Sequence, residues 1–201
     1  MTRILVAYTT NAGSTTEVAE AVATELGKDG AQVDLVRLEQ VTSLEGYHAV
    51  VIGAPMILGW HRAAQKFVKT HRAVLASVPA AYFCTAMSLT QTTGSPSGAP
   101  PLFIDPWLAK APKNPARLSY KENYAAPASY LKPILKAAPA VKPVSIAFFG
   151  GKLEMFRLKL LQALFVMVII QAQPGDLRNW SAIQEWAASL RPLFAARGVV
   201  V

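Results

Sequence analysis

Small hydrogen-bonding residues follow the first apolar run of this 201-residue chain. The run Ile4–Ala7 leads into a loop that reads Thr9-Thr10-Asn11-Ala12-Gly13-Ser14-Thr15, and a helical pattern begins there. The first N–H groups of a helix have no internal partner, and the helix dipole favours an anion at this end. Gly13 allows close approach of the backbone and a positive φ. The loop is therefore predicted to hold a phosphate group.

The composition of this loop narrows the kind of phosphate ligand. The chain contains neither the G-x-x-x-x-G-K-[ST] loop of nucleoside triphosphate sites nor the G-x-G-x-x-G fingerprint of dinucleotide sites. A hydroxyl-rich loop with one glycine and no lysine suits the phosphate of flavin mononucleotide (FMN), held by neutral donors. The S-x-x-E spacing of Ser14 and Glu17 predicts a capping box that fixes the helix start. The alternative for the whole segment is an ordinary capped turn between a strand and a helix.

The loop resembles the phosphate loop of the flavodoxin family, whose pattern runs roughly [ST]-x-[ST]-G-x-T. The matching residues are Thr10, Asn11, Gly13, Ser14 and Thr15. Ala12 stands where the family usually has a hydroxyl, so one side-chain contact to the phosphate is expected to be missing.

The elements that position the loop alternate as a parallel α/β sheet requires. The predicted strands are Arg3–Tyr8, Ala31–Leu38, His48–Ala54, Ala80–Thr85 and Val141–Gly150. The predicted helices are Ser14–Lys28, Trp60–Ala76, Tyr120–Ala138 and Ser181–Ala196, the last with a capping spacing at Ser181 and Gln184. We expect one α/β domain over 1–201, with a flavodoxin-like, doubly wound, five-stranded parallel sheet of order 2-1-3-4-5. The second strand, which mixes polar and apolar residues, is expected at an edge.

In such a sheet a ligand binds beyond the carboxyl ends of the first and third strands, where three loops meet. The predicted FMN contacts are Thr9, Thr10, Asn11, Ala12, Gly13, Ser14 and Thr15 in the first loop, Ala54, Pro55, Met56 and Trp60 in the second, and Thr85, Ala86 and Met87 in the third. Trp60 is the candidate to stack on the flavin ring. The alternative is that Trp60 packs its helix onto the sheet.

The remaining reactive side chains do not form a catalytic group. His48, His61 and His71 lack metal-site spacing, and no metal site is expected. His61 is a candidate base near the ring edge, with a solvated helix position as the alternative. Cys84, the single cysteine, lies in an apolar run and is expected to be buried and inert. Flavin chemistry needs no catalytic triad, so no catalytic residue is predicted.

Charge is divided unevenly along the chain. Residues 1–59 hold three Lys/Arg and seven Asp/Glu, whereas residues 60–201 hold seventeen and five. A basic surface suits an anionic membrane, an anionic substrate or a nucleic acid. No nucleic-acid motif accompanies these charges, so nucleic acid is not an expected partner. The N-terminus enters a strand almost at once, so no signal peptide is expected, and the single cysteine fits a reducing, cytoplasmic compartment.

Two segments depart from the regular pattern. Residues 88–138 form a proline-rich insert between the fourth and fifth strands, too long for an idle connection. Residues 152–173 form a basic hydrophobic segment, predicted as a helix, whose apolar run is shorter than the roughly 20 residues that cross a bilayer. This segment is either a buried helix or an interfacial one, and its basic residues favour peripheral contact with an anionic membrane on the inner face of the cell membrane.

Taken together, these features resemble the flavodoxin-like protoporphyrinogen dehydrogenase family of haem biosynthesis. The resemblance rests on Thr10–Glu17, on Val50–Ala54 with the basic helix around Ala64–Lys69, and on Gly150–Gly151 followed by the basic hydrophobic segment. It implies oxidation of protoporphyrinogen IX to protoporphyrin IX on FMN, with electrons passed to a membrane quinone. The alternatives are a flavodoxin-type electron carrier without its own substrate, and an interaction protein that has lost flavin. The insert and Ala12 depart from the family pattern.

Overall fold

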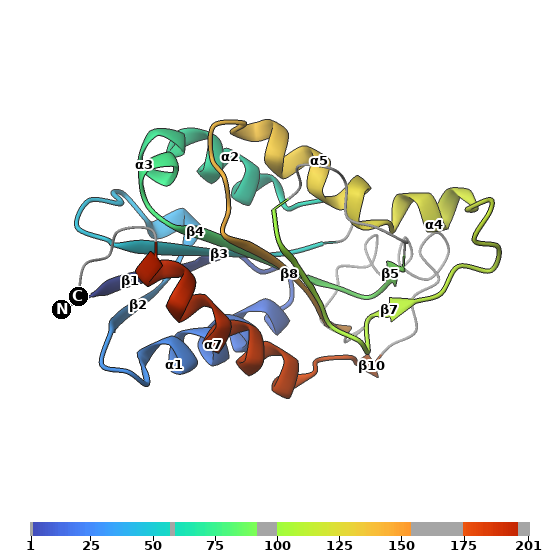
Figure 1. The fold of residues 1–201 in the computed structure, drawn as a ribbon, viewed down its shortest axis with the longest axis horizontal. Helices are drawn as coiled ribbons and strands as arrows, with labels where there is room; N and C mark the ends of the chain where they lie inside the picture. Colours follow the sequence, from blue (N-terminus) through green and yellow to red (C-terminus); the bar gives the residue numbers. More distant parts are fainter. Residues whose placement is uncertain (1, 57–58, 92–99, 154–174, 197–201) are drawn as a thin grey trace.

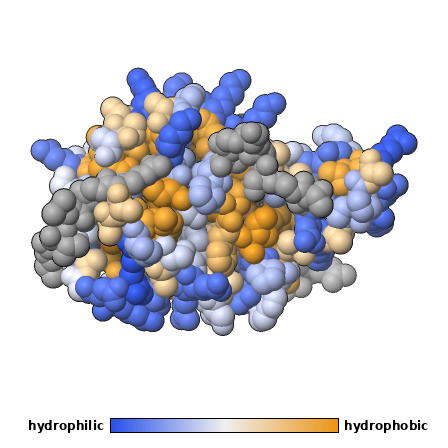
Figure 2. Space-filling model, in the orientation of Figure 1, coloured by the Kyte–Doolittle hydropathy of each residue, from blue (hydrophilic) through white to orange (hydrophobic). Residues whose placement is uncertain are grey.

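The computed structural model describes residues 2–56, 59–91, 100–153 and 175–196. A central parallel sheet is covered by helices on both faces (Figure 1). Hydrophilic residues line the rim of the face shown in Figure 2, with hydrophobic residues toward its middle. The architecture is the doubly wound α/β arrangement that the alternating sequence pattern predicts.

The sheet has six parallel strands in the order β2-β1-β3-β4-β8-β6. The strands are β1 (Arg3–Tyr8), β2 (Gln32–Arg37), β3 (Ala49–Pro55), β4 (Ala80–Ala86), β6 (Leu102–Ile104) and β8 (Ser145–Gly150). The predicted order of five strands is confirmed, with β2 at one edge. The sixth strand, β6, comes from the insert and adds beyond β8. The fifth predicted strand begins at Ser145 rather than Val141, after Pro143, which has no N–H for a ladder.

Helices pack on the two faces of the sheet over separate apolar cores. The helices are α1 (Ser14–Gly27), α2 (Arg62–Thr70), α3 (Arg72–Ser77), α4 (Tyr120–Tyr124), α5 (Pro127–Ala137) and α7 (Trp180–Ala196), with a 3-10 turn η1 (Leu38–Gln40). α1 and α7 lie side by side on one face (Figure 1). There the buried Trp186 ring packs edge-on against Phe83 and Phe149, at centroid distances of 6.0 and 5.5 Å. α2, α3 and α5 cover the other face.

Four predicted helix features differ from the structure. The helix expected over 60–76 is divided into α2 and α3, and that expected over 120–138 is divided before Pro127, which begins α5. Both predicted capping boxes are wrong. Gly13, not Ser14, is the N-cap of α1, and the Asn179 side chain accepts a hydrogen bond from the Ala182 N–H at the start of α7 (3.3 Å). Ser14 and Ser181 instead lie within the first turns of their helices.

A buried carboxylate of the insert reinforces the pairing of β6 with the sheet. Besides β6 it contributes β5 (Leu89–Thr90) and β7 (Ala109–Lys110), which pair with each other. Asp105, directly after β6, is fully buried and accepts hydrogen bonds from the N–H groups of Trp107 (2.9 Å) and Gly150 (3.3 Å) and from the Asn179 amide (3.1 Å). These bonds connect the insert to β8 and to the start of α7.

Most of the basic hydrophobic segment lies outside the described residues. Of 152–173 the structure describes only Lys152 and Leu153, which form β9 and pair antiparallel with β10 (Gly175–Asp176). The helix predicted for this segment is thus neither confirmed nor contradicted. Among the helices that are described, none has the length and apolar character needed to span a bilayer.

Candidate flavin site

The start of α1 has the backbone geometry of an anion site. Gly13 adopts φ 94°, and no side chain in the described part of the chain caps the helix. The Gly13 N–H donates to the Thr10 hydroxyl oxygen (2.9 Å), which closes the loop ahead of the helix. Because the N-cap residue has no side chain, the first N–H groups of this 14-residue helix are left without a side-chain acceptor. This arrangement suits a phosphate held by backbone donors.

The threonines of the loop mainly hold it in place. The buried Thr9 hydroxyl donates to the Glu39 carboxylate (2.7 Å), and the buried Thr15 hydroxyl shares a 2.9 Å hydrogen bond with that of Thr85. Neither Asn11, which is exposed, nor Ser14, which is half-buried, has a side-chain hydrogen bond within the described parts of the chain. Asn11 and Ser14 are therefore the loop side chains best placed to turn toward a ligand.

The second loop continues from the buried end of β3, at Ala54 and Pro55. The Met56 N–H donates to the Thr85 carbonyl (2.8 Å), and Met56 forms an isolated antiparallel bridge with Trp60. The Trp60 ring is only 3% exposed and meets the Tyr82 ring edge-on at 6.2 Å. This placement favours the packing role of Trp60 over the predicted stacking role, because the indole lies within the core.

The third loop is joined to the other two. Thr85 accepts from Met56 through its carbonyl and pairs with Thr15 through its hydroxyl. The Ala86 carbonyl accepts from the Gly151 N–H (2.8 Å), and Met87 is half-buried beyond it. The structure thus brings the three predicted loops together at the carboxyl edge of the sheet, as the strand order predicts.

The other reactive side chains are occupied structurally. The His61 Nδ1 accepts from the Ala63 N–H (3.2 Å) and so caps α2. Complete burial raises the pKa of the Cys84 thiol well above its usual value, as expected of an inert thiol. No group of side chains suited to a metal ion occurs among the described residues.

A charged cluster at this end of α1 was not predictable from the sequence. Arg178 Nη1 lies 2.7 Å from Glu17 Oε2, and Arg178 Nη2 lies 2.5 Å from Asp176 Oδ2. The hydrogen bonds to Asp176 are the main reason that the pKa of Arg178 is raised. No motif marks Arg178, because it is far from the loop in the chain and only the fold brings it there.

The family is decided by a match over most of the chain. A family model described as "Flavodoxin domain" matches residues 5–178. The chain belongs to the flavodoxin domain family. Membership implies FMN as the cofactor, and the uncapped helix start with its neutral donors fits the FMN phosphate.

The flavodoxin-domain chain also has curated relatives over part of its length. It is 37% identical over 84 residues to "Protoporphyrinogen IX dehydrogenase [quinone]" of Escherichia coli K12, and equally to the protein of that name from strain O157:H7. The match covers 40% of this chain and 46% of each relative. The chain thus spans about half the length of the curated relatives it matches.

A solved structure agrees on the fold. A flavodoxin from the domain Archaea superposes with a TM-score of 0.51 at 12% identity, covering 96% of this chain and 98% of that one. At this identity the likeness establishes the fold alone.

Proposed function

We propose that this flavodoxin-domain protein is an FMN-dependent oxidoreductase that oxidises protoporphyrinogen IX to protoporphyrin IX and passes the electrons to a membrane quinone. The observation that carries the proposal is the uncapped start of α1, which is hydrogen-bonded through Thr15 to Thr85 of the third loop, itself bonded to Met56 of the second. The reaction itself is suggested by the name of the E. coli relatives.

The chain's own residues contribute binding and exclusion of water. Backbone N–H groups after Gly13 hold the phosphate, while Thr15 and Thr85 keep the first and third loops in register. When bound, FMN supplies the hydride and electron chemistry. The predicted contact set remains part of the proposal: Thr9, Thr10, Asn11, Ala12, Gly13, Ser14, Thr15, Ala54, Pro55, Met56, Trp60, Thr85, Ala86 and Met87. In this proposal the buried Trp60 ring and the hydrogen-bonded hydroxyls of Thr9 and Thr15 also pack the site.

We further propose that the protein works in the cytoplasm and touches the inner face of the cell membrane through residues 152–173. The support is the basic composition of residues 60–201 and the basic apolar sequence of that segment. Replacing Lys152, Arg157 and Lys159 by Ser should release the protein from anionic vesicles. A matched triple of Lys66, Lys69 and Arg72 to Ser, on α2 and α3, should leave vesicle binding unchanged. Persistent binding of the first variant would refute the electrostatic contact.

The reaction is tested by an anaerobic absorbance titration. The protein is reconstituted with FMN, protoporphyrinogen IX is added, and the flavin bands and porphyrin absorbance are followed. Bleaching of the flavin with formation of porphyrin supports the dehydrogenase proposal. A bound flavin that stays oxidised argues for an electron carrier or another substrate. Failure to bind FMN contradicts the cofactor assignment itself.

A further inference from the structure

Arg178 is a cation at the N-terminal end of α1, where the helix dipole does not favour one. Its side chain is 5% exposed and contacts Glu17 in the first turns of α1. A positive charge near a helix N-terminus opposes the helix dipole. The loop of residues 9–16 contains no charged residue, so the charge of this end is set by Arg178, by its partners Glu17 and Asp176, and by Glu39, which accepts from Thr9.

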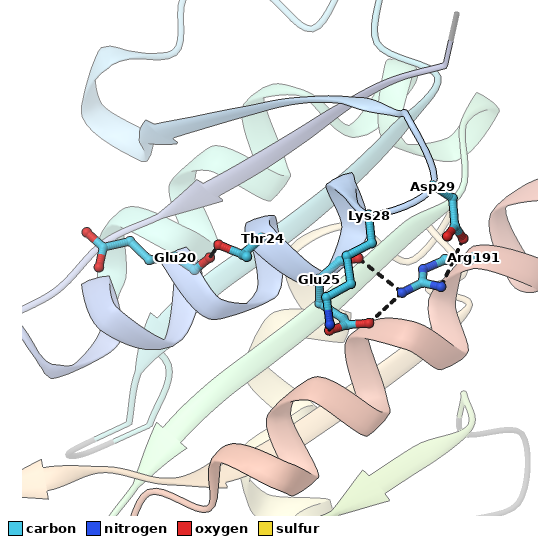
Figure 3. Close-up of polar contacts among 6 residues, drawn as sticks. All are labelled: Glu20, Thr24, Glu25, Lys28, Asp29 and Arg191. Carbon is cyan, nitrogen blue, oxygen red and sulfur yellow. Dashed lines mark hydrogen bonds and ion pairs between the residues drawn. The ribbon is translucent and has the colours of Figure 1, made fainter.

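A second arginine, Arg191 on α7, lies at the end of α1 where the helix dipole favours a cation. Arg191 Nη2 lies 2.5 Å from Glu25 Oε1, and Arg191 Nη1 lies 2.9 Å from Asp29 Oδ2, at the C-terminal end of α1 (Figure 3). Its Nη2 also donates to the Glu25 carbonyl (3.1 Å). A cation at a helix C-terminus is favoured by the dipole and by the last carbonyls. The helix dipole therefore favours Arg191, whereas Arg178, although paired with Asp176 and Glu17, places its charge at the end of α1 that the dipole disfavours.

A bound anion at this end of α1 would make a nearby cation favourable. A phosphate ester carries nearly two negative charges at pH 7. Helical side chains lean toward the N-terminus, so the Glu17 carboxylate lies over the first turn and would repel that phosphate. We propose that Arg178 is the buried positive charge that offsets Glu17 and so permits the FMN phosphate to bind at the start of α1. The inference rests on the proposed cofactor and adds a residue to its phosphate site.

The surroundings of Arg178 hold this charge in a fixed position. Its Nε and Nη2 donate to the two oxygens of Asp176 at 2.7 and 2.5 Å. The guanidinium also lies 4.7 Å from the centroid of the Trp180 ring. A buried, preorganised charge is little screened by salt and loses no side-chain freedom when the anion binds.

The test separates the phosphate from the flavin ring. The flavin-free full-length chain is titrated with FMN and with riboflavin, which lacks the phosphate, by quenching of flavin fluorescence. We expect Arg178→Gln to weaken FMN binding about tenfold, the scale of one nearby charge. Riboflavin affinity should change less than about twofold, since its ring does not sense the phosphate site. Arg178→Lys, which keeps the charge, should retain most of the FMN preference.

Arg191→Gln is the matched control, because Arg191 also pairs with two carboxylates but lies at the other end of α1. It should leave the ratio of FMN to riboflavin affinity unchanged. An unchanged ratio in Arg178→Gln, or an equal fall of the ratio in Arg191→Gln, would overturn the inference.

A second variant tests the inference if Arg178→Gln fails to fold. Glu17→Gln, at a side chain that is 48% exposed, should raise the ratio of FMN to riboflavin affinity severalfold. A ratio that stays constant or falls contradicts the inference. Wild-type protein that binds neither flavin would overturn the proposed cofactor as well, whereas wild-type binding with unaltered ratios in the variants would overturn the role of Arg178 alone.

Discussion

The two ends of α1 carry similar ion pairs in opposite electrostatic settings. At the C-terminal end, Arg191 joins Glu25 and Asp29 and agrees with the helix dipole. At the N-terminal end, Arg178 joins Glu17 and Asp176 against it. The ion pairs at the two ends of α1 therefore serve stability at one end and, on our proposal, an anion at the other. The direction of the helix distinguishes the two roles.

The largest effect is expected from the glycine at the phosphate end. Gly13→Asp should abolish FMN binding, a loss of about 100-fold or more, because it places a carboxylate and a Cβ against the phosphate. The control is Gly30→Asp, after the other end of α1, where Gly30 also has a positive φ (82°) and an added Cβ meets nothing within 4 Å. Both variants share backbone strain, so FMN affinity separates them. Equal FMN affinity in the two variants would refute the loop assignment.

At the opposite end, Arg191→Gln should lower the thermal midpoint by about 3 °C while FMN affinity stays at its wild-type value. The reason is that, among the residues described, Glu25, whose side chain is 9% exposed, would keep only Lys28 as an ion-pair partner. Thermal unfolding followed by circular dichroism measures the shift. Lys28→Gln, at a side chain that is 57% exposed, should cost less. A larger loss in the lysine variant would contradict this account.

Acid should weaken the C-terminal end through Glu25. The hydrogen bond from Lys28, followed by the charges of Lys28 and Arg191, lowers the pKa of Glu25 below its usual value of 4.5. A carboxyl whose folded pKa is lowered stabilises the fold above its unfolded pKa, and that contribution is lost as pH falls through the folded pKa. The thermal midpoint should thus fall as the pH drops below about 4.5. Glu25→Gln should show a shallower fall, and an identical slope would exclude Glu25 as a cause.

The smallest effect on stability is expected from a substitution in the middle of α1. The Thr24 hydroxyl donates to the Glu20 carbonyl (2.8 Å) on the exposed face of α1 (Figure 3). Thr24→Ala should change the free energy of unfolding by no more than about 0.5 kcal/mol, since alanine's higher helix propensity offsets the lost bond. Urea denaturation measures this difference. A loss of several kcal/mol would show that more than its two ends holds α1 in place.

The sequence predicted the central sheet well because its strands are continuous apolar runs. Arg3–Tyr8 has the predicted bounds, and the ends of β3 and β4 lie within one residue of prediction. The predicted capping boxes at Ser14 and Ser181 are wrong because Gly13 and Asn179, which precede these serines, are the actual N-caps. β6 was not predicted because a strand of three residues is too short to show an alternation of polar and apolar side chains.

The candidate site was predictable in its loops and not in its charges. The meeting of the three loops follows from strand order, and the bonds from Thr85 to Thr15 and Met56 agree with it. The burial of Trp60 depends on packing against Tyr82, which no local pattern encodes. Arg178 contacts Glu17 only in the folded chain, where α7 packs on α1. The sequence alone therefore does not indicate this ion pair.

The edge position of β6 has a consequence for how the chain emerges from the ribosome. β6 comes before β8 in the sequence but lies outside it in the sheet, with β8 as its neighbour. Its ladder cannot form until β8 has been synthesised. During translation β6 must therefore wait, unpaired, while β2, β1, β3 and β4 can already pair with one another. The last strand added to this sheet is thus not the last one made.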